Sequence, residues 1–98
     1  MKFLVLFEDA PDAPADLRQR HMGAHLDFLE AHAGSVAAAG PLHRADGTGA
    51  GGVWVVDADG AEAVEALIRA DPFYPTGLRK SWQVLRWTQV FADGARRV

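Results

Sequence analysis

The sequence predicts an α+β fold of the ferredoxin-like type, with a four-stranded antiparallel sheet and two helices on one face. The main observation is the order of its segments, which alternate as strand, helix, strand, strand, helix, strand. The length of 98 residues suits one modest core, and 49% apolar with 23% charged residues is ordinary for a globular protein. We therefore expect a single domain over residues 1–98, of which residues 92–98 form a flexible tail.

The first predicted strand is the continuous apolar run Phe3–Phe7, which is typical of a strand in the middle of a sheet. A loop with two prolines follows, and a helix is then predicted from about residue 15 to residue 33, with Gly34 as its cap. At 100° per residue its apolar side chains fall on one side: Leu17, Met22, Ala24, Leu26, Phe28, Leu29 and Ala33. Three histidines lie near the middle of that side, which is unusual: His21, His25 and His32.

The middle of the chain predicts two short strands. Residues 35–39 have too little length for a helix between Gly34 and Gly40-Pro41, so we expect a strand there. A glycine-rich loop is expected over residues 42–52, before the apolar strand Val53–Val56. The glycines resemble a phosphate-binding loop, but a strand rather than a helix follows them and the P-loop lysine is missing. We expect a flexible hairpin loop.

The second helix and the last strand complete the pattern. Asp59 and Glu62 have the spacing of a capping box for a helix that ends at Ala70. One face of this helix is apolar: Val64, Leu67 and Ile68. After a turn over residues 71–77, the last strand is predicted over Ser81–Phe91.

The second face of the predicted sheet has no helix to cover it. Trp54, Trp82 and Trp87 cannot all point to the helix side, so apolar surface remains for a partner. Face-to-face packing of two sheets would cover it. We therefore expect a homodimer formed through the sheet face.

Composition excludes several classes of protein. Ten basic against thirteen acidic residues give a net charge of -3, which argues against a nucleic-acid partner. There is no cysteine, so disulfides and thiolate metal sites are excluded. The run Phe3–Phe7 is too short for a signal-peptide core or a membrane span. We expect a cytoplasmic protein with no membrane partner.

Several short motifs follow one another along the chain. Ala24-His25-Leu26 lies in the first predicted helix, Ala39-Gly40-Pro41-Leu42 ends the second strand, and Ala70-Asp71-Pro72-Phe73 ends the second helix. Gly77 and a last strand with tryptophans come next. Together, from Phe3 to Trp87, this pattern resembles the YCII-related family of small proteins. The resemblance implies a dimeric α+β barrel built from ferredoxin-like subunits.

The resemblance also implies a site. In that family, a histidine before a leucine on the first helix and the aspartate of an Asp-Pro-aromatic motif form the active-site pair, which matches His25 and Asp71 here. One branch resembles dehydrochlorinases that act on chlorinated hydroxyquinols, and the wider fold includes muconolactone isomerases and small monooxygenases. This chain departs from the pattern at His21, one helical turn before His25, so the choice of histidine stays open.

The residues themselves favour the same pair. Pro72 disfavours helical backbone at Asp71, which places this carboxylate at a helix end, where it can face a cleft. A carboxylate can orient one ring nitrogen of His25 and stabilise the imidazolium, leaving the other nitrogen as general acid or base. The hypothesis is a lyase or isomerase acting on a small, cyclic organic ligand without a cofactor. The alternative is a non-catalytic ligand-binding or structural homodimer, in which the pair only ties the helices together.

Six residues are candidates for substrate binding: His21, Gly40, Pro41, His43, Phe73 and Tyr74. The aromatic pair Phe73 and Tyr74 could line an apolar pocket or simply cover the helix end. His21 and His25 also have the i, i+4 spacing that can chelate a metal. No intervening glutamate or second ligand cluster accompanies them, so no metal site is predicted.

Overall fold

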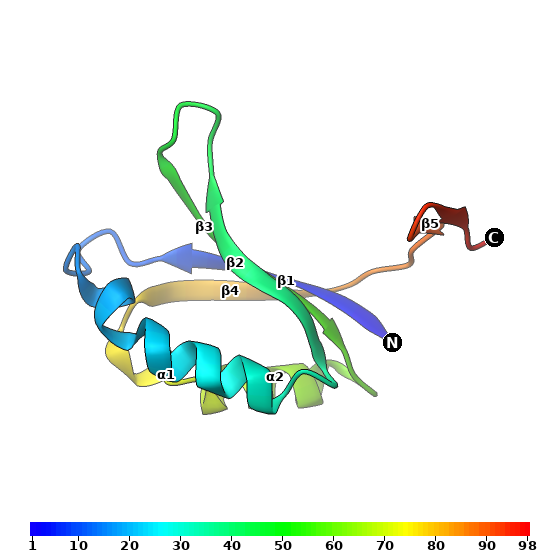
Figure 1. Cartoon of the computed structure of the whole chain (residues 1–98), viewed down its shortest axis with the longest axis horizontal. Coiled ribbons are helices and arrows are strands. Elements are labelled where there is room, and N and C mark those ends of the chain that lie inside the picture. The colour runs from blue at the N-terminus through cyan, green and yellow to red at the C-terminus, as the bar shows by residue number, and fades with distance from the viewer.

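The computed structural model describes residues 1–98 and has the predicted order of elements. The main elements are β1 (Lys2–Asp9), α1 (Leu17–Ala31), β2 (Val36–His43), β3 (Gly49–Asp57), α2 (Ala61–Ala70) and β4 (Arg79–Arg86). A 3-10 turn, η1 (Tyr74–Thr76), separates α2 from β4. The strands form one antiparallel sheet in the order β2-β3-β1-β4, and both helices lie on one side of it (Figure 1). The ferredoxin-like prediction is confirmed.

β1 is the central strand, because it pairs with β3 on one side and with β4 on the other. Alternate side chains of a strand point to opposite faces. Phe3, Val5 and Phe7 are buried toward the helices, whereas Leu4 and Leu6 lie half-buried on the opposite face. The strand is therefore apolar on both faces, as its continuous apolar sequence predicts.

The core lies between the sheet and the helices. Its largest members come from three elements, with Val5 of β1, Trp54 of β3 and Ile68 of α2 almost fully buried. Phe28 and Leu29 of α1 pack against the edge of this cluster and stay partly exposed. α2 therefore supplies more of the core than α1 does.

α1 differs from the prediction in its end and in its buried side. It ends at Ala31 and His32 is its C-terminal cap, so the expected cap at Gly34 is wrong. The His32 N–H bonds the carbonyls of Phe28 and Leu29, and the Ala33 N–H bonds that of Glu30, so the last turn is closed before the chain reaches Gly34. Leu26, predicted on the buried side, is 48% exposed. A pocket, described below, opens beside this part of the helix.

The predicted capping box of α2 is also wrong. The N-terminal cap is Gly60, and no side chain caps the helix. Asp59 precedes this cap by one residue, so its carboxylate does not occupy the capping position. The other predictions for α2 are confirmed, since it ends at Ala70 and buries Val64 and Ile68 completely.

The second and third strands are longer than predicted. β2 continues through Gly40-Pro41 to His43, and β3 already begins at Gly49, so the expected loop over residues 42–52 shrinks to a turn. These strands project beyond the body of the molecule as a hairpin (Figure 1). Gly51 has a φ of +86°, and a Cβ there would overlap the carbonyl oxygen of Phe7. Only glycine fits this close approach between β3 and β1.

The last strand is shorter than predicted. β4 ends at Arg86 rather than at Phe91, because its partner β1 begins at Lys2 and offers no backbone groups beyond that point. The chain then leaves the sheet and forms a separate two-stranded hairpin from β5 (Phe91–Ala92) and β6 (Ala95–Arg96). This hairpin stands away from the body (Figure 1). The flexibility expected for residues 92–98 stays a prediction.

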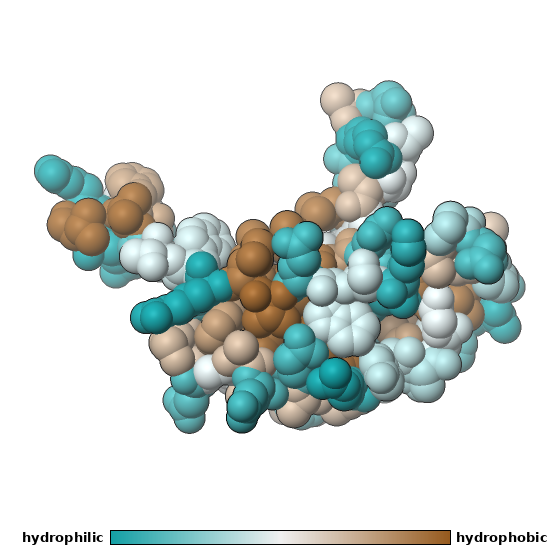
Figure 2. All heavy atoms as spheres, turned by 180° about the vertical axis from the view of Figure 1, so that it is seen from behind, coloured by the Kyte–Doolittle hydropathy of each residue, from teal (hydrophilic) through white to brown (hydrophobic).

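The face of the sheet opposite the helices is apolar and uncovered. It carries half-buried or exposed aliphatic side chains from β1, β3 and β4: Leu4, Leu6, Val53, Val55 and Leu85. Trp54 and Trp82 lie on the helix side, the indole N–H of Trp82 donating to Glu65 of α2, while Trp87 is exposed just beyond β4. Apolar atoms also gather in the middle of the body when the molecule is viewed from behind (Figure 2). Neither helix is long and apolar enough to cross a membrane.

Candidate active site

Asp71 is fixed at the end of α2 by its own backbone. It is the C-terminal cap, with extended backbone angles of φ −65° and ψ 132°, which is the conformation that a following proline favours. Its Oδ1 accepts a hydrogen bond from the backbone N–H of Phe73 at 3.0 Å. The residue is only 1% exposed. The predicted helix end therefore holds a buried carboxylate in one orientation.

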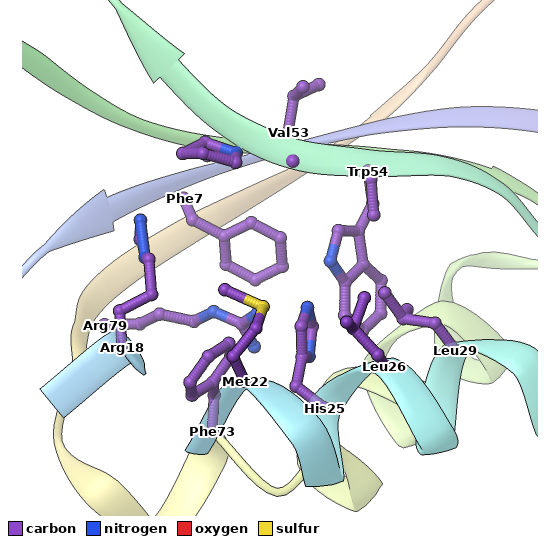
Figure 3. Close-up of a pocket in the computed structure, with 14 residues that line it drawn as sticks. Phe7, Arg18, Met22, His25, Leu26, Leu29, Val53, Trp54, Phe73 and Arg79 are labelled. Atoms are coloured by element: carbon purple, nitrogen blue, oxygen red, sulfur yellow. The ribbon is translucent and has the colours of Figure 1, made fainter. Parts of the chain in front are cut away.

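His25 of α1 meets this carboxylate. Its Nδ1 lies 2.8 Å from Oδ1 of Asp71, and the histidine is 7% exposed. The hydrogen bond leaves Nε2 without a protein partner. The imidazole ring packs on Phe73, with the ring centres 4.3 Å apart, and points into a pocket (Figure 3). The buried His25–Asp71 pair that the sequence predicts is thus present.

Arg79, the first residue of β4, completes the surroundings of the aspartate. Its Nη1 lies 2.9 Å from Oδ2 of Asp71, and both side chains are buried. The two groups form an ion pair, but they are not aligned as a hydrogen bond. The guanidinium carbon also lies 4.0 Å from the centre of the Phe7 ring, an attractive cation–π contact. Asp71 therefore has a partner at each carboxylate oxygen.

Electrostatics keep Asp71 ionised. Burial by itself raises the pKa of Asp71, but the hydrogen bonds from His25 and the Phe73 N–H, together with the charge of Arg79, hold this pKa below its usual value. Burial lowers the pKa of Arg79, and the neighbouring Asp71 charge opposes that shift. A carboxylate held in its charged form is suited to orient an imidazole and to stabilise it when protonated.

A pocket of about 160 Å³ opens between α1 and the sheet, in front of His25. Its walls are mostly apolar, and its polar side chains are His25 and two arginines. The lining residues are Phe7, Arg18, Met22, His25, Leu26, Leu29, Ala39, Gly40, Pro41, Gly52, Val53, Trp54, Phe73 and Arg79. Asp71 does not line it but lies behind the imidazole. The arrangement can present one ring nitrogen to a bound molecule while the other is held by a buried carboxylate.

Three of the predicted binding residues line this pocket, namely Gly40, Pro41 and Phe73. The other three lie outside it. His21 is half-buried on α1, His43 is exposed at the end of β2, and Tyr74 packs against Trp82 with ring centres 6.0 Å apart. Of the two histidines left open by the sequence, His25 is the one that bonds to the aspartate. No group of three or more histidine, aspartate or glutamate side chains is placed to hold a metal ion.

Sequence reasoning missed both arginines of the pocket. Arg79 follows the turn after Asp71, and only the length of that turn and the pairing of Asp9 with Arg79 bring its side chain back over Phe7. Arg18 falls in the first turn of α1, where a lone basic residue gives no signal of its own. Phe7 was predicted in a central strand and Trp54 in the packing of the sheet, and neither was predicted to line a pocket. Both side chains belong to the core and also form a wall of the pocket.

Comparison with known proteins gives two results. The YCII-related domain matches residues 1–88. Among solved structures, the chain is similar to 5-chloro-2-hydroxyhydroquinone dehydrochlorinase (TftG) from Burkholderia phenoliruptrix AC1100, in complex with 2,5-dihydroxybenzoquinone. The TM-score is 0.74 at 27% identity, covering 90% of this chain and 94% of that protein. No curated protein matches.

Proposed function

The chain belongs to the YCII-related family, and from this premise we propose that it is a small acid–base enzyme of the lyase or isomerase type. The observation that carries the proposal is the state of the His25 ring. One of its nitrogens is held by a buried carboxylate, and the other has no protein partner and faces an open pocket. An open pocket favours an enzyme over a structural pair, for which we would expect a filled interior.

We assign His25 the role of general base and acid, and Asp71 that of its orienting group. Because Asp71 is ionised, the Nδ1 of His25 carries the proton in this hydrogen bond, and the lone pair of Nε2 is directed into the pocket. A proton removed from a substrate would form an imidazolium that Asp71 stabilises. A positioned side chain of this kind contributes about 10²–10⁴-fold to a reaction rate.

The size of the pocket supports a substrate with a single ring. Cavities of about 150 Å³ bind benzene, and this pocket has a volume of about 160 Å³. The ligand of the dehydrochlorinase, 2,5-dihydroxybenzoquinone, is also a single ring. Loss of HCl from a chlorinated hydroxyquinol needs one base for the proton and a leaving chloride, and it gives a quinone without an external oxidant. His25 could supply that base.

Turnover of defined substrates tests the proposal. The protein would be incubated with 5-chloro-2-hydroxyhydroquinone, and released chloride and quinone absorbance would be followed. Isomerase-type proton transfer would be followed as deuterium uptake from solvent into the one-ring substrate. Wild type should accelerate one of these reactions and His25→Gln should not, while His21→Gln, a matched change outside the pocket, should retain activity. If wild type accelerates neither, the protein is better described as a ligand-binding or structural dimer.

We also propose that the protein is a homodimer through the uncovered sheet face. The aliphatic side chains on that face, including the half-buried Leu4 and the exposed Leu85, would be covered by a second sheet. Light scattering after size exclusion tests this. Wild type should be a dimer, and Leu85→Glu should be a monomer. Val90→Glu alters an equally apolar residue outside the sheet and should leave the dimer intact. A monomeric wild type would contradict the proposal.

A further inference from the structure

We propose that Arg18 is the anion-binding residue of this pocket, so that the substrate is a one-ring compound carrying an acidic oxygen, a carboxylate or a phenolate. The inference rests on the proposed function, because it concerns the same pocket. It adds the chemical class of the substrate and the direction in which the ring lies relative to His25.

Arg18 lies on the same face of α1 as His25. Arg18, Met22, His25 and Leu29 are spaced by three or four residues, so they share one helical face, and all four line the pocket. Arg18 and His25 are separated by two helical turns, about 10 Å along the helix axis. Figure 3 shows Arg18 at the end of the pocket opposite Leu29, with His25 between them. A ring held next to His25 can therefore direct a substituent toward Arg18.

Only one nitrogen of the Arg18 guanidinium is used within the protein. Both contacts to Asp9 come from one nitrogen, Nη2, at 3.1 and 3.0 Å from the two carboxylate oxygens. A guanidinium has five N–H donors, and Nη1 and Nε of Arg18 have no hydrogen-bond partner in the protein. Asp9 thus holds the side chain in place while leaving donors free to bind a carboxylate or phenolate oxygen.

Arg18 and Arg79 both line the pocket but differ in their exposure. Arg79 is buried, and its charge is matched by Asp71 directly behind His25. The Arg18 side chain is 29% exposed and lies at the pocket rim. Burial lowers the pKa of Arg79 most, and the positive charge of Arg18 lowers it further, so the two guanidinium groups are close enough to interact electrostatically. A substrate anion would be attracted by both positive groups and would bond directly to Arg18, whose donors are exposed at the pocket, whereas the Arg79 side chain is only 7% exposed.

A matched pair of ligands isolates the charge. Benzoate and benzamide have nearly the same shape, but only benzoate is anionic at neutral pH. Each would be titrated into the full chain, and the amide resonances around the pocket would be followed by NMR. The variants are Arg18→Gln and, as a control, Arg20→Gln, which removes the same charge from an exposed side chain outside the pocket.

We expect wild type to bind benzoate more tightly than benzamide. Arg18→Gln should weaken the binding of benzoate by about tenfold, or about 1.4 kcal/mol, and leave the binding of benzamide unchanged, because only benzoate loses a hydrogen bond between two charged groups. Arg20→Gln should change neither affinity by more than about twofold, the effect of a screened surface charge.

Three results would overturn the assignment of Arg18: equal loss of both ligands in Arg18→Gln, equal loss of benzoate in the two variants, or no preference of wild type for benzoate. These results leave the acid–base function standing if turnover depends on His25. Conversely, a benzoate site that depends on Arg18 in a protein without turnover would retain this inference and reject the enzyme.

Discussion

The two helices lie side by side on one face of the sheet, but they have different structural roles. α2 is strongly amphipathic and buries Val64 and Ile68 completely. α1 is longer but only weakly amphipathic, and its buried residues are Leu17 and His25. One side of α1 forms the wall of a pocket instead of the core. α2 therefore contributes mainly to the stability of the fold. α1 carries residues of the candidate site and buries fewer apolar side chains.

The first prediction concerns activity and should show the largest effect. His25→Gln is expected to lower turnover of an accepted substrate by about 10²–10⁴-fold, because the base is lost. His21→Gln, one turn away on the same helix but outside the pocket, should retain most of the activity. Steady-state kinetics of both variants checks this. Equal losses of activity in the two variants would mean that His25 has no specific role as a base and that both substitutions act by disturbing α1.

The second prediction concerns the link between the helices, since the His25–Asp71 hydrogen bond joins α1 to the end of α2. Asp71→Asn should lower the free energy of unfolding at pH 7 by about 3–5 kcal/mol, because Arg79 is left buried without a counter-charge. The carboxylate has a folded-state pKa below its unfolded value of about 3.9, so its contribution is present above that pH and is lost as the pH falls further.

Urea unfolding of wild type and Asp71→Asn between pH 7 and pH 2 measures this contribution. The difference between the two proteins should be constant at neutral pH and should narrow in the acid range, as the aspartate of the wild type becomes protonated. A difference that stays constant down to pH 2 would show that the charge of Asp71 contributes nothing to stability.

The third prediction concerns α2 alone. Ile68→Ala should lower the free energy of unfolding by about 2–5 kcal/mol, because the side chain is fully buried and its removal leaves a cavity. Activity per folded molecule should stay near that of wild type, since Ile68 does not line the pocket. Urea unfolding and kinetics on the same samples check both parts. A large loss of turnover in fully folded Ile68→Ala would contradict the view that α2 contributes to stability and not to activity.

The fourth prediction concerns the exposed apolar side of α1 and should show the smallest effect on stability. Leu26→Gln is expected to change the free energy of unfolding by no more than about 0.5 kcal/mol, as for most surface substitutions. Leu26 is 48% exposed yet lines the pocket, so the variant should weaken binding of a one-ring ligand. Thermal unfolding and ligand titration separate the two effects. A loss of several kcal/mol would identify Leu26 as a core residue after all.

Local signals account for what the sequence predicted well. Alternation and apolar runs gave the order of the elements, and Pro72 placed Asp71 at the end of α2 because its effect on the preceding residue is local. The end of β4 and the place of Arg79 depend instead on pairing with β1, which no local pattern encodes. The buried side of α1 was overestimated for a related reason. A helix that borders a pocket carries apolar residues, such as Leu26, that periodicity alone assigns to the core.

The walls of the pocket come from segments with separate origins. The imidazole and the guanidinium groups lie on α1 and at the start of β4, whereas β2 and β3 contribute side chains as small as Ala39, Gly40 and Gly52. A Cβ at Gly52 would approach the Gly40 carbonyl oxygen to 3.3 Å, so that position has little room for a side chain, whereas a Cβ at Gly40 would meet no atom within 4 Å. Substitutions on β2 can therefore narrow or reshape the space offered to a ring without altering the acid–base groups. On the proposed function, changes on β2 would alter which rings fit while His25, Asp71 and Arg79 stay unchanged, so the shape of the pocket can diverge in evolution while the acid–base groups are retained.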